Sequence, residues 1–501
     1  MKLPESVHNR LSYGGILIIV LALIAFVFLL ILQITAGHAE KPYAAVVTFV
    51  AVPAVMIFGM ILVPIGMIRE RRFIQRTGAG SKISLPVIDL NDSRHRNASL
   101  IVIVGALFLL FTTAFGSYQA FEATESVAFC GQLCHSVMHP EYTAYERSPH
   151  ARVSCVGCHV GPGADWYVRS KLSGLYQVYA ITFGTYPVPI AAPISNLRPA
   201  QETCEQCHWP DKFFEQQLRK QVHFLSDEPN SRWEIDLLIK TGGGGLDRPQ
   251  AGGIHWHMNI ENKVEYIATD EKRQQIPWMR ITNKVTGYAR EYMSTENPLS
   301  DEDKAAASVR RMDCIDCHNR PSHIYRPPRT SVNQSMAVSR IDPTLPSIKA
   351  KAVELLSAEY PSTDAAVRGI EQGLRTFYEE KYPDVADQRG GVIRSSIAEI
   401  QDIYTHNFFP EMKVRWDVYP NNIGHLTFPG CFRCHDGKHQ TADGRVLSKE
   451  CTDCHAILSQ GKPDAMKYAT DRVGLAFEHP VDIGPAWQEM ACHECHKGGA
   501  Q

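Results

Sequence analysis

Six copies of one five-residue pattern, C-x-x-C-H, recur along this chain and use twelve of its fourteen cysteines. Two thiols at this spacing add to the vinyl groups of haem as thioethers, and the adjoining imidazole ligates the iron. Neither structural zinc nor a disulfide framework requires a histidine directly after each second cysteine. The patterns therefore predict covalently bound c-type haem, with these residues as attachment and iron-ligating groups: Cys155, Cys158, His159; Cys204, Cys207, His208; Cys314, Cys317, His318; Cys431, Cys434, His435; Cys451, Cys454, His455; Cys492, Cys495, His496.

The two remaining cysteines form an irregular variant of the same pattern. In "FCGQLCHSVMHPE", three residues separate Cys130 from Cys134, and His135 follows directly. The alternative interpretation is a pair of buried free thiols. Residues four apart on a helix lie on nearly the same face as residues three apart, so the extra residue is compatible with attachment. We therefore predict a seventh haem, which would account for every cysteine.

Three apolar stretches near the N-terminus are each long enough to cross a bilayer, which takes about 20 residues. A cleaved signal peptide is the alternative for the first, but its apolar run is too long and two more follow. The stretches cover residues 14–34, 43–68 and 98–120.

Basic residues in the connecting loops predict the orientation of these spans. Residues 69–97 carry seven basic side chains, whereas residues 35–42 carry only Lys41. The positive-inside rule places the N-terminus and the longer loop in the cytoplasm. Everything after about residue 121 is then extracytoplasmic, which is the side where bacteria attach c-type haem. The formal net charge of −2 gives no indication of a nucleic-acid partner.

We expect a mainly α fold with much irregular structure, consisting of three transmembrane helices and an extracytoplasmic multihaem domain with a small β-meander. The meander is predicted from "KVEYIATD", "PWMRITN" and "GYAREYM", and residues 346–410 show helical spacing of Ile393, Ile397, Ile400 and Tyr404. Porphyrin is expected to form much of the apolar core. The predicted domains are a membrane anchor (1–120, with a cytoplasmic loop at 69–97), a domain for haems 1–3 (121–240), a Gly-rich link with the meander (241–310) and a domain for haems 4–7 (311–501).

Each low-spin haem needs a second axial ligand, and fourteen histidines lie outside the motifs. Any one of them could be an ordinary surface or core histidine. As a set they suffice for seven irons, although the sequence does not pair them with particular haems. The candidates for the distal position are His150, His223, His255, His257, His323, His425, His439 and His479.

One stretch resembles a known family. A membrane helix followed by "CGQLCHSVMHPEYTAYERSPHARVSCVGCH", "KLSG" and "CEQCH" is similar to the NapC/NirT family of membrane-anchored multihaem quinol dehydrogenases over roughly residues 100–225. The longer architecture resembles the heptahaem inner-membrane (ImcH-like) members of metal-respiring bacteria.

The resemblance implies a quinol site beside the first haem at the membrane surface. Met138 corresponds to a methionine that replaces histidine as iron ligand there, one position later than usual. Lys171 corresponds to a lysine near the quinol; the alternative is a surface lysine that snorkels. The acidic residue expected seven positions later is absent, because that position is Val178. Asp165, Glu141 or a haem propionate could accept the quinol protons instead.

The function implied is oxidation of quinol, expected to be menaquinol, at the bacterial inner membrane. Electrons would pass through the haems to a periplasmic cytochrome or another periplasmic or outer-membrane redox partner. One alternative is an electron-conducting subunit of a larger membrane complex, with other membrane subunits as partners. A second is a terminal multihaem reductase, which would need a haem with an open distal position.

Overall fold

The structure is a computed structural model and describes residues 5–35, 51–78, 89–133, 135–161, 163–193, 198–208, 216–242, 253–259 and 261–498. The chain divides into two compact units. The first contains Met1–Phe129 and Cys155–Tyr176, and the second contains Cys130–Ser154 and Gln177–Gln501.

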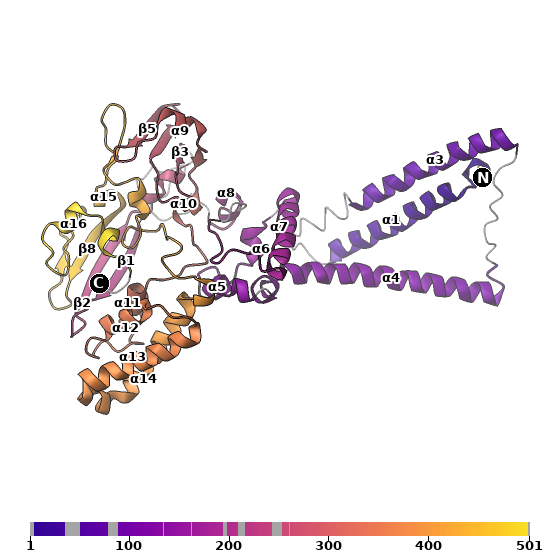
Figure 1. Cartoon of the computed structure of the whole chain (residues 1–501). Coiled ribbons are helices and arrows are strands. Elements are labelled where there is room, and N and C mark those ends of the chain that lie inside the picture. Colours follow the sequence, from indigo (N-terminus) through magenta and orange to yellow (C-terminus); the bar gives the residue numbers. More distant parts are fainter. Residues whose placement is uncertain are drawn as a thin grey trace. The chain divides into compact units, whose positions relative to one another are not determined.

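Three long apolar helices dominate the first unit (Figure 1). They are α1 (Arg10–Thr35), α3 (Val52–Thr77) and α4 (Ser93–Glu125). Each is long and apolar enough to cross a membrane, which confirms the three predicted spans; residues 43–50 of the second span lie outside the described ranges. The unit also contains the short helices η1 (Glu5–Val7) and α6 (Cys155–His159) and the start of α7 (Ala164–Thr182).

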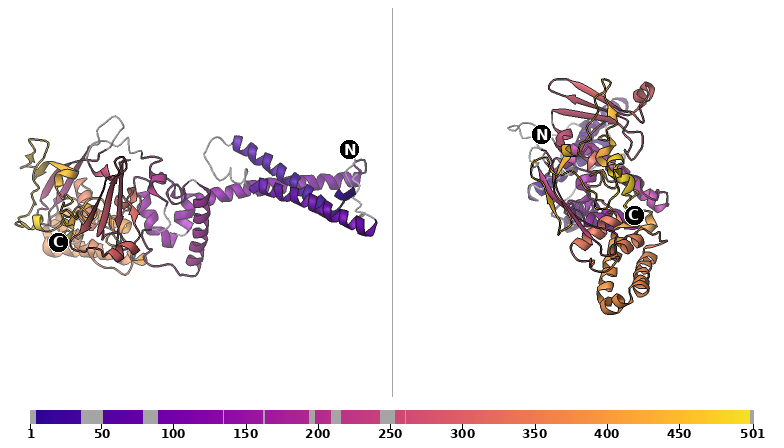
Figure 2. Two further views of the ribbon diagram at one scale, coloured as in Figure 1. Left: turned by 90° about the horizontal axis from the view of Figure 1, so that it is seen from above. Right: turned by 90° about the vertical axis from the view of Figure 1, so that its left-hand side faces the viewer.

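Helices α1 and α3 run side by side and approach closely at two glycines (Figure 2). A Cβ atom added at Gly15 would lie 2.8 Å from the carbonyl oxygen of Gly59, and one added at Gly59 would lie 2.9 Å from the carbonyl oxygen of Gly15. One turn away, the Ser12 hydroxyl donates a hydrogen bond to the Val63 carbonyl at 3.1 Å. Small residues that let backbones approach, together with a polar contact, are typical of helix pairs in membranes.

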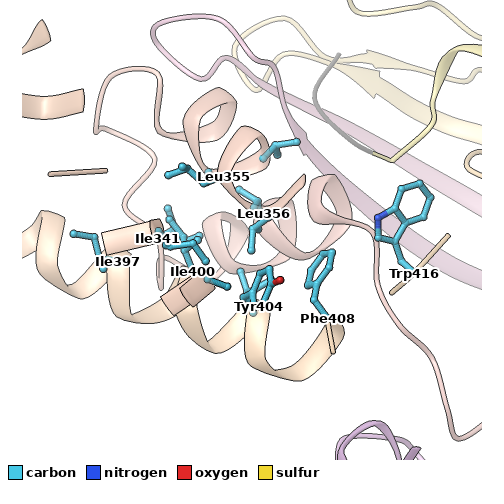
Figure 3. Packing of buried hydrophobic residues seen from close by; sticks show 14 of the residues in the cluster. Ile341, Leu355, Leu356, Ile397, Ile400, Tyr404, Phe408 and Trp416 are labelled. Atoms are coloured by element: carbon cyan, nitrogen blue, oxygen red, sulfur yellow. The ribbon is translucent and has the colours of Figure 1, made fainter. Parts of the chain in front are cut away.

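A helical layer forms the main apolar core of the second unit. It consists of α11 (Pro328–Ala337), α12 (Ile348–Ser357), α13 (Thr363–Lys381) and α14 (Pro383–Asn407). The predicted helical region over 346–410 is confirmed, and Ile393, Ile397, Ile400 and Tyr404 are all buried. Figure 3 shows Ile400 and Tyr404 packed beside Leu356 and Ile341. This layer therefore has a core of its own side chains.

Two antiparallel sheets complete the second unit. The five-stranded sheet has the order β6-β3-β4-β5-β7, and its centre is the predicted meander. The four-stranded sheet has the order β1-β2-β8-β9 and was not predicted. The strands are β1 (Gln217–Phe224), β2 (Arg232–Ile239), β3 (Asn262–Ile267), β4 (Trp278–Asn283), β5 (Ala289–Ser294), β6 (Arg310–Arg311), β7 (His439–Gln440), β8 (His455–Gly461) and β9 (Lys467–Tyr468).

The remaining elements are short, and irregular chain connects them. They are the π-helical turn η3 (Phe129–Leu133), α5 (His135–Glu146), α8 (Ala200–Cys204), η5 (Ile254–Met258), α9 (Asp301–Ala306), α10 (Cys314–Cys317), η6 (Pro410–Met412), η7 (Gly430–Arg433), α15 (Cys451–Cys454), α16 (Ala486–Glu489) and α17 (Cys492–Cys495). The fold is thus mainly helical, with small sheets and much irregular structure, as expected.

The glycine contact between α1 and α3 predicts a position-specific effect of a bulky side chain. We expect Gly59→Leu to weaken the helix pair by about 1–3 kcal/mol, the usual cost of overpacking. Gly14→Leu is the matched control, because nothing lies within 4 Å of its added Cβ. Denaturation by dodecyl sulfate in mixed micelles, followed by far-ultraviolet circular dichroism, measures the difference. Equal losses in the two variants would contradict the assigned contact.

Candidate haem sites

The plain motifs share one local geometry. Four C-x-x-C stretches form a single helical turn (α6, α10, α15 and α17), Cys431 lies in the 3-10 turn η7, and Cys204–Cys207 forms a turn at the end of α8, so the two cysteines of each motif lie close together. In four motifs the backbone N–H of the histidine donates to the carbonyl of the first cysteine, at 2.8 Å for His208, His318 and His496 and 3.0 Å for His435. His455 makes the same hydrogen bond to Cys451. The turn therefore delivers two thiols and one imidazole to one place.

The irregular motif begins with a different turn. Residues Phe129–Leu133 form the π-helical turn η3, and α5 begins at His135. A π-turn closes hydrogen bonds five residues apart instead of four, so it accommodates one extra residue. Cys134 and the side chain of His135 lie outside the described residues. Met138 follows on α5 and is half-buried.

Five motif histidines of the second unit each face a histidine from outside the motifs. All five partners belong to the predicted distal set. The ring centroids are 5.9 Å apart for His150 and His208, 6.3 Å for His255 and His318, 5.9 Å for His257 and His435, 6.2 Å for His425 and His455, and 6.0 Å for His479 and His496.

These separations match two imidazoles on opposite sides of one iron. An imidazole nitrogen lies about 2 Å from a metal that it ligates, and its ring centroid lies roughly 1 Å farther out, so a pair places its centroids about 6 Å apart. The residues present therefore fit bis-histidine haem at five of the seven predicted positions.

In four of these ten histidines, the ring nitrogen Nδ1 is hydrogen-bonded to a backbone carbonyl oxygen. Nδ1 of His257 lies 2.9 Å from the Ile254 carbonyl oxygen, and Nδ1 of His435 lies 2.8 Å from the Ser448 carbonyl oxygen. Carbonyls of Val481 and Pro321 hold Nδ1 of His479 at 2.7 Å and of His150 at 3.3 Å. A carbonyl accepts only, so Nδ1 carries the proton and Nε2 keeps its lone pair for a metal. His496 differs, because its Nδ1 contacts the Arg329 guanidinium.

Burial keeps several of these rings neutral, which iron ligation requires. Burial lowers the pKa values of His255, His257 and His425 below the usual range. Burial, followed by the Arg329 charge, lowers the pKa of His496 to about 4.

The short helix η5 supplies two histidines to two motifs. His255 and His257 are two residues apart on this 3-10 turn, so they project from different sides. His255 faces His318, and His257 faces His435. One turn of chain therefore brings the fourth and fifth predicted haems next to each other.

The other three predicted distal histidines, His223, His323 and His439, also have polar contacts within the protein. Nε2 of His439 lies 2.7 Å from the Ile276 carbonyl oxygen and its Nδ1 lies 2.9 Å from Asp436, so both ring nitrogens bind protein. His223 is half-buried, and its Nδ1 lies 3.4 Å from Asn333. Desolvation, followed by the charges of Lys349 and Arg329, lowers its pKa to about 4. Nδ1 of His323 lies 3.0 Å from the Glu141 carbonyl oxygen.

The five attachment turns of the second unit follow one another in space in their chain order. The Cys314 thiol is hydrogen-bonded to Cys204, which lowers the pKa of Cys314. Further along the chain, electrostatic interactions link thiols of successive motifs: Cys317 with Cys431, Cys431 with Cys454, and Cys451 with Cys492. The third to seventh motifs are thus a row of neighbours.

Interior residues of two motifs lock the fourth and fifth turns together. The Asp316 carboxylate is almost fully buried and accepts hydrogen bonds from the Tyr266 hydroxyl at 2.7 Å and Arg310 Nε at 2.8 Å. Arg433, from the fifth motif, donates from Nη2 to the Asp316 carbonyl at 2.8 Å. The residues between the two cysteines of a motif therefore help to fix the position of that motif in the fold.

Lys171 has an acidic partner that the sequence interpretation missed. Its Nζ lies 3.1 Å from a carboxylate oxygen of Glu125, the last residue of α4, and the Glu125 side chain is only 17% exposed. The ammonium also lies over the rings of Tyr167 and Phe121, at 5.0 and 5.8 Å from their centroids. Of the acids suggested earlier, Glu141 is paired with Arg320 at 3.2 Å, and Asp165 is exposed in the first turn of α7.

Comparison with known proteins identifies the family. Residues 92–190 match the N-terminal region of the NapC/NirT cytochrome c family. Over 494 residues, the chain is 44% identical to the cytochrome c-type protein ImcH of Geobacter sulfurreducens, an alignment that covers 98% of this chain and 96% of that protein. The chain belongs to the NapC/NirT cytochrome c family.

As a cytochrome c of the NapC/NirT family, the chain carries covalently bound haem c and has an electron-transfer role at a membrane. The family match includes the irregular motif, the second motif, Met138 and Lys171. The structure places Lys171 in the first unit and Met138 in the second. No solved structure matches the chain.

Proposed function

We propose that this NapC/NirT cytochrome binds seven haems c, oxidises quinol at the membrane and passes the electrons to a periplasmic acceptor. The observation that carries the proposal is the set of five imidazole pairs, each spaced for one iron, on a row of neighbouring attachment turns. A membrane anchor of three helices gives such a chain access to a lipid-soluble donor. When bound, haem c supplies one-electron chemistry.

The residues of this chain would bind the haems and fix their positions. At five of the sites two imidazoles would hold the haem iron, and the backbone carbonyls behind His257 and His435 fix the orientation of those rings. We assign His150, His255, His257, His425 and His479 as the distal ligands of haems 3 to 7, respectively. Met138, His223 and His323 remain the candidates for the first two haems. The cysteines, including Cys130 and Cys134, hold each group covalently.

Lys171 and Glu125 provide the acid–base groups for quinol. Oxidation releases two electrons and two protons from one quinol. The Lys171 ammonium donates a hydrogen bond that steadies a quinol oxygen as it loses its proton, and the neighbouring Glu125 carboxylate accepts that proton. The end of α4 therefore supplies the carboxylate that is missing at Val178.

Location and partners follow from the same proposal. The basic loop keeps the N-terminal side in the cytoplasm of a bacterium, and the second unit lies in the periplasm. Menaquinol in the inner membrane is the donor, and a periplasmic cytochrome or another periplasmic or outer-membrane redox protein is the acceptor.

One alternative function has support from a specific observation. The anchor has more helices than the matched family region contains, since α1 and α3 lie before residue 92. Such helices could join the chain to other membrane subunits, with quinol oxidised elsewhere. A terminal reductase is disfavoured, because five haem positions have both axial sides supplied with imidazole.

The haem count can be measured directly. We expect the intact mass of the mature protein to contain seven haem additions, and Cys130→Ser with Cys134→Ser to contain six. Wild-type protein with only six additions would show that the irregular motif does not bind haem.

Replacing one proposed distal ligand should change the spin state of one haem. We expect His425→Ala to leave one iron five-coordinate, which produces a high-spin ferric signal in the electron paramagnetic resonance spectrum. His439→Ala is the control, because the ring of His439 is bound to Asp436 and to the Ile276 carbonyl. A fully low-spin spectrum from the His425 variant would remove it from the ligand set.

Quinol oxidation should depend on Lys171 and Glu125, whereas chemical reduction should not. A lost charge-assisted hydrogen bond costs about 1.5–3 kcal/mol, so we expect Lys171→Ala to oxidise quinol roughly tenfold to a hundredfold more slowly. Glu125→Gln should also slow quinol oxidation, because an amide cannot accept the proton. Dithionite should still reduce all haems in both variants.

Arg169→Ala is the matched control, since Arg169 lies on the same helix but over Trp166, at 5.3 Å from the ring centroid. If Lys171→Ala oxidises quinol at the wild-type rate, the quinol site lies elsewhere or in a partner subunit. If Glu125→Gln oxidises quinol at the wild-type rate, Glu125 is only a structural partner of Lys171.

A further inference from the structure

Helix α7 presents a stripe of exposed apolar side chains. Val168, Leu172, Leu175 and Tyr179 recur at helical spacing, and each is more than half exposed, from 53% at Tyr179 to 68% at Leu175. Tyr176 and, just past the helix, Phe183 extend the same face at 65% and 66% exposed. A contiguous apolar face of this length normally has a partner.

The edge of α7 beside this stripe contacts the end of the third membrane span. The Tyr167 ring lies 6.1 Å from the Phe121 ring, and Lys171 pairs with Glu125 at 3.1 Å. Phe121 and Glu125 belong to the last turns of α4. Helix α7 does not continue the direction of α4 but runs across its end (Figures 1 and 2). It is therefore held at the level where α4 leaves the bilayer.

The amino-acid composition of α7 is typical of a helix at a lipid–water interface. Trp166, Tyr167, Tyr176 and Tyr179 are all aromatic residues with a polar group, which favours the boundary between acyl chains and headgroups. Arg169, beside Trp166, and Lys171 place cations on the same short helix, where they can reach anionic lipid headgroups.

We propose that α7 lies in the outer lipid–water interface, with the stripe of Val168, Leu172, Leu175 and Tyr179 against the acyl chains of the bilayer. The choice of lipid over a second protein follows from continuity, because the helix is joined to the exit point of a membrane span. The proposal goes beyond quinol oxidation and does not require it. If quinol is the substrate, α7 also holds Lys171 at the depth that a membrane-dissolved molecule reaches.

The test measures the depth of single residues of the full-length, haem-loaded protein in nanodiscs of phosphatidylcholine and phosphatidylglycerol. Leu172→Cys and Leu175→Cys are labelled with a nitroxide in the air-oxidised protein, because dithionite would reduce the nitroxide as well as the haems. Intact mass confirms the full haem complement of each variant. Power saturation is first recorded under nitrogen, which measures the relaxation that ferric haem causes. That value is subtracted before access of apolar oxygen is compared with access of a polar nickel chelate.

Val285→Cys is the matched control, because Val285 is 73% exposed in a hairpin turn of the second unit. We expect the ratio of oxygen to nickel access at residues 172 and 175 to be several-fold higher than at residue 285. Equal ratios would show that the stripe faces water. Loss of access to both reagents would show that haem or protein covers it. Either result overturns the proposal.

A label-free measurement protects against variants that fail to mature. Wild-type protein in nanodiscs that contain a phospholipid with a diazirine on its acyl chain is irradiated, and the cross-linked peptides are mapped by mass spectrometry. We expect adducts within residues 164–183 in addition to the three spans. Adducts confined to the spans would contradict an interfacial α7.

Discussion

Paired imidazoles at the spacing of one iron are the constraint on which the second unit depends. Each of the five pairs joins segments that are distant in the sequence or separated by irregular chain, as His257 and His435 show. In the proposed haem arrangement, each iron closes a loop between such segments, and the free energy of ligation contributes to folding. This explains how long stretches of irregular chain can keep a defined position although the unit has few regular elements.

The protein part of the scaffold has two other roles. Helices α11 to α14 carry no attachment motif and pack around buried apolar side chains, so they form a core that exists apart from haem. The sheets attach motifs to that body: β8 begins at His455, directly after an attachment turn, and pairs with β2. Asp316 and Arg433 do the same between neighbouring motifs. Haem positions and protein packing are therefore linked through residues of the motifs themselves.

The sequence predicted the parts of the structure that depend on local chemistry. The attachment turns follow from cysteine spacing, the spans from apolar length, and the meander and the helical region from periodicity. Pairing of the histidines was not predictable, because it depends on which segments meet in space. The ring of His439 is bound within the protein through Asp436, three residues before it, and through the Ile276 carbonyl in the loop before β4. Nothing in its local sequence distinguishes it from a ligand. The four-stranded sheet was missed because two of its strands lie in the last part of the chain, among haem motifs.

Glu125 shows why a search along one helix can miss an acid–base group. The expected carboxylate would lie two turns after Lys171 on α7, where Val178 stands instead. The structure brings a carboxylate to the same ammonium from the end of α4. An ammonium near a membrane surface needs a nearby anion to limit the cost of its partial burial, and the helix that supplies the anion does not affect that electrostatic requirement. In the proposed quinol site, placing the anion on α4 couples proton acceptance to the anchor. A shift of α4 along the membrane normal would move Glu125, Phe121 and the helix that carries Lys171 together, so the span itself would set the depth of the proposed site in the bilayer.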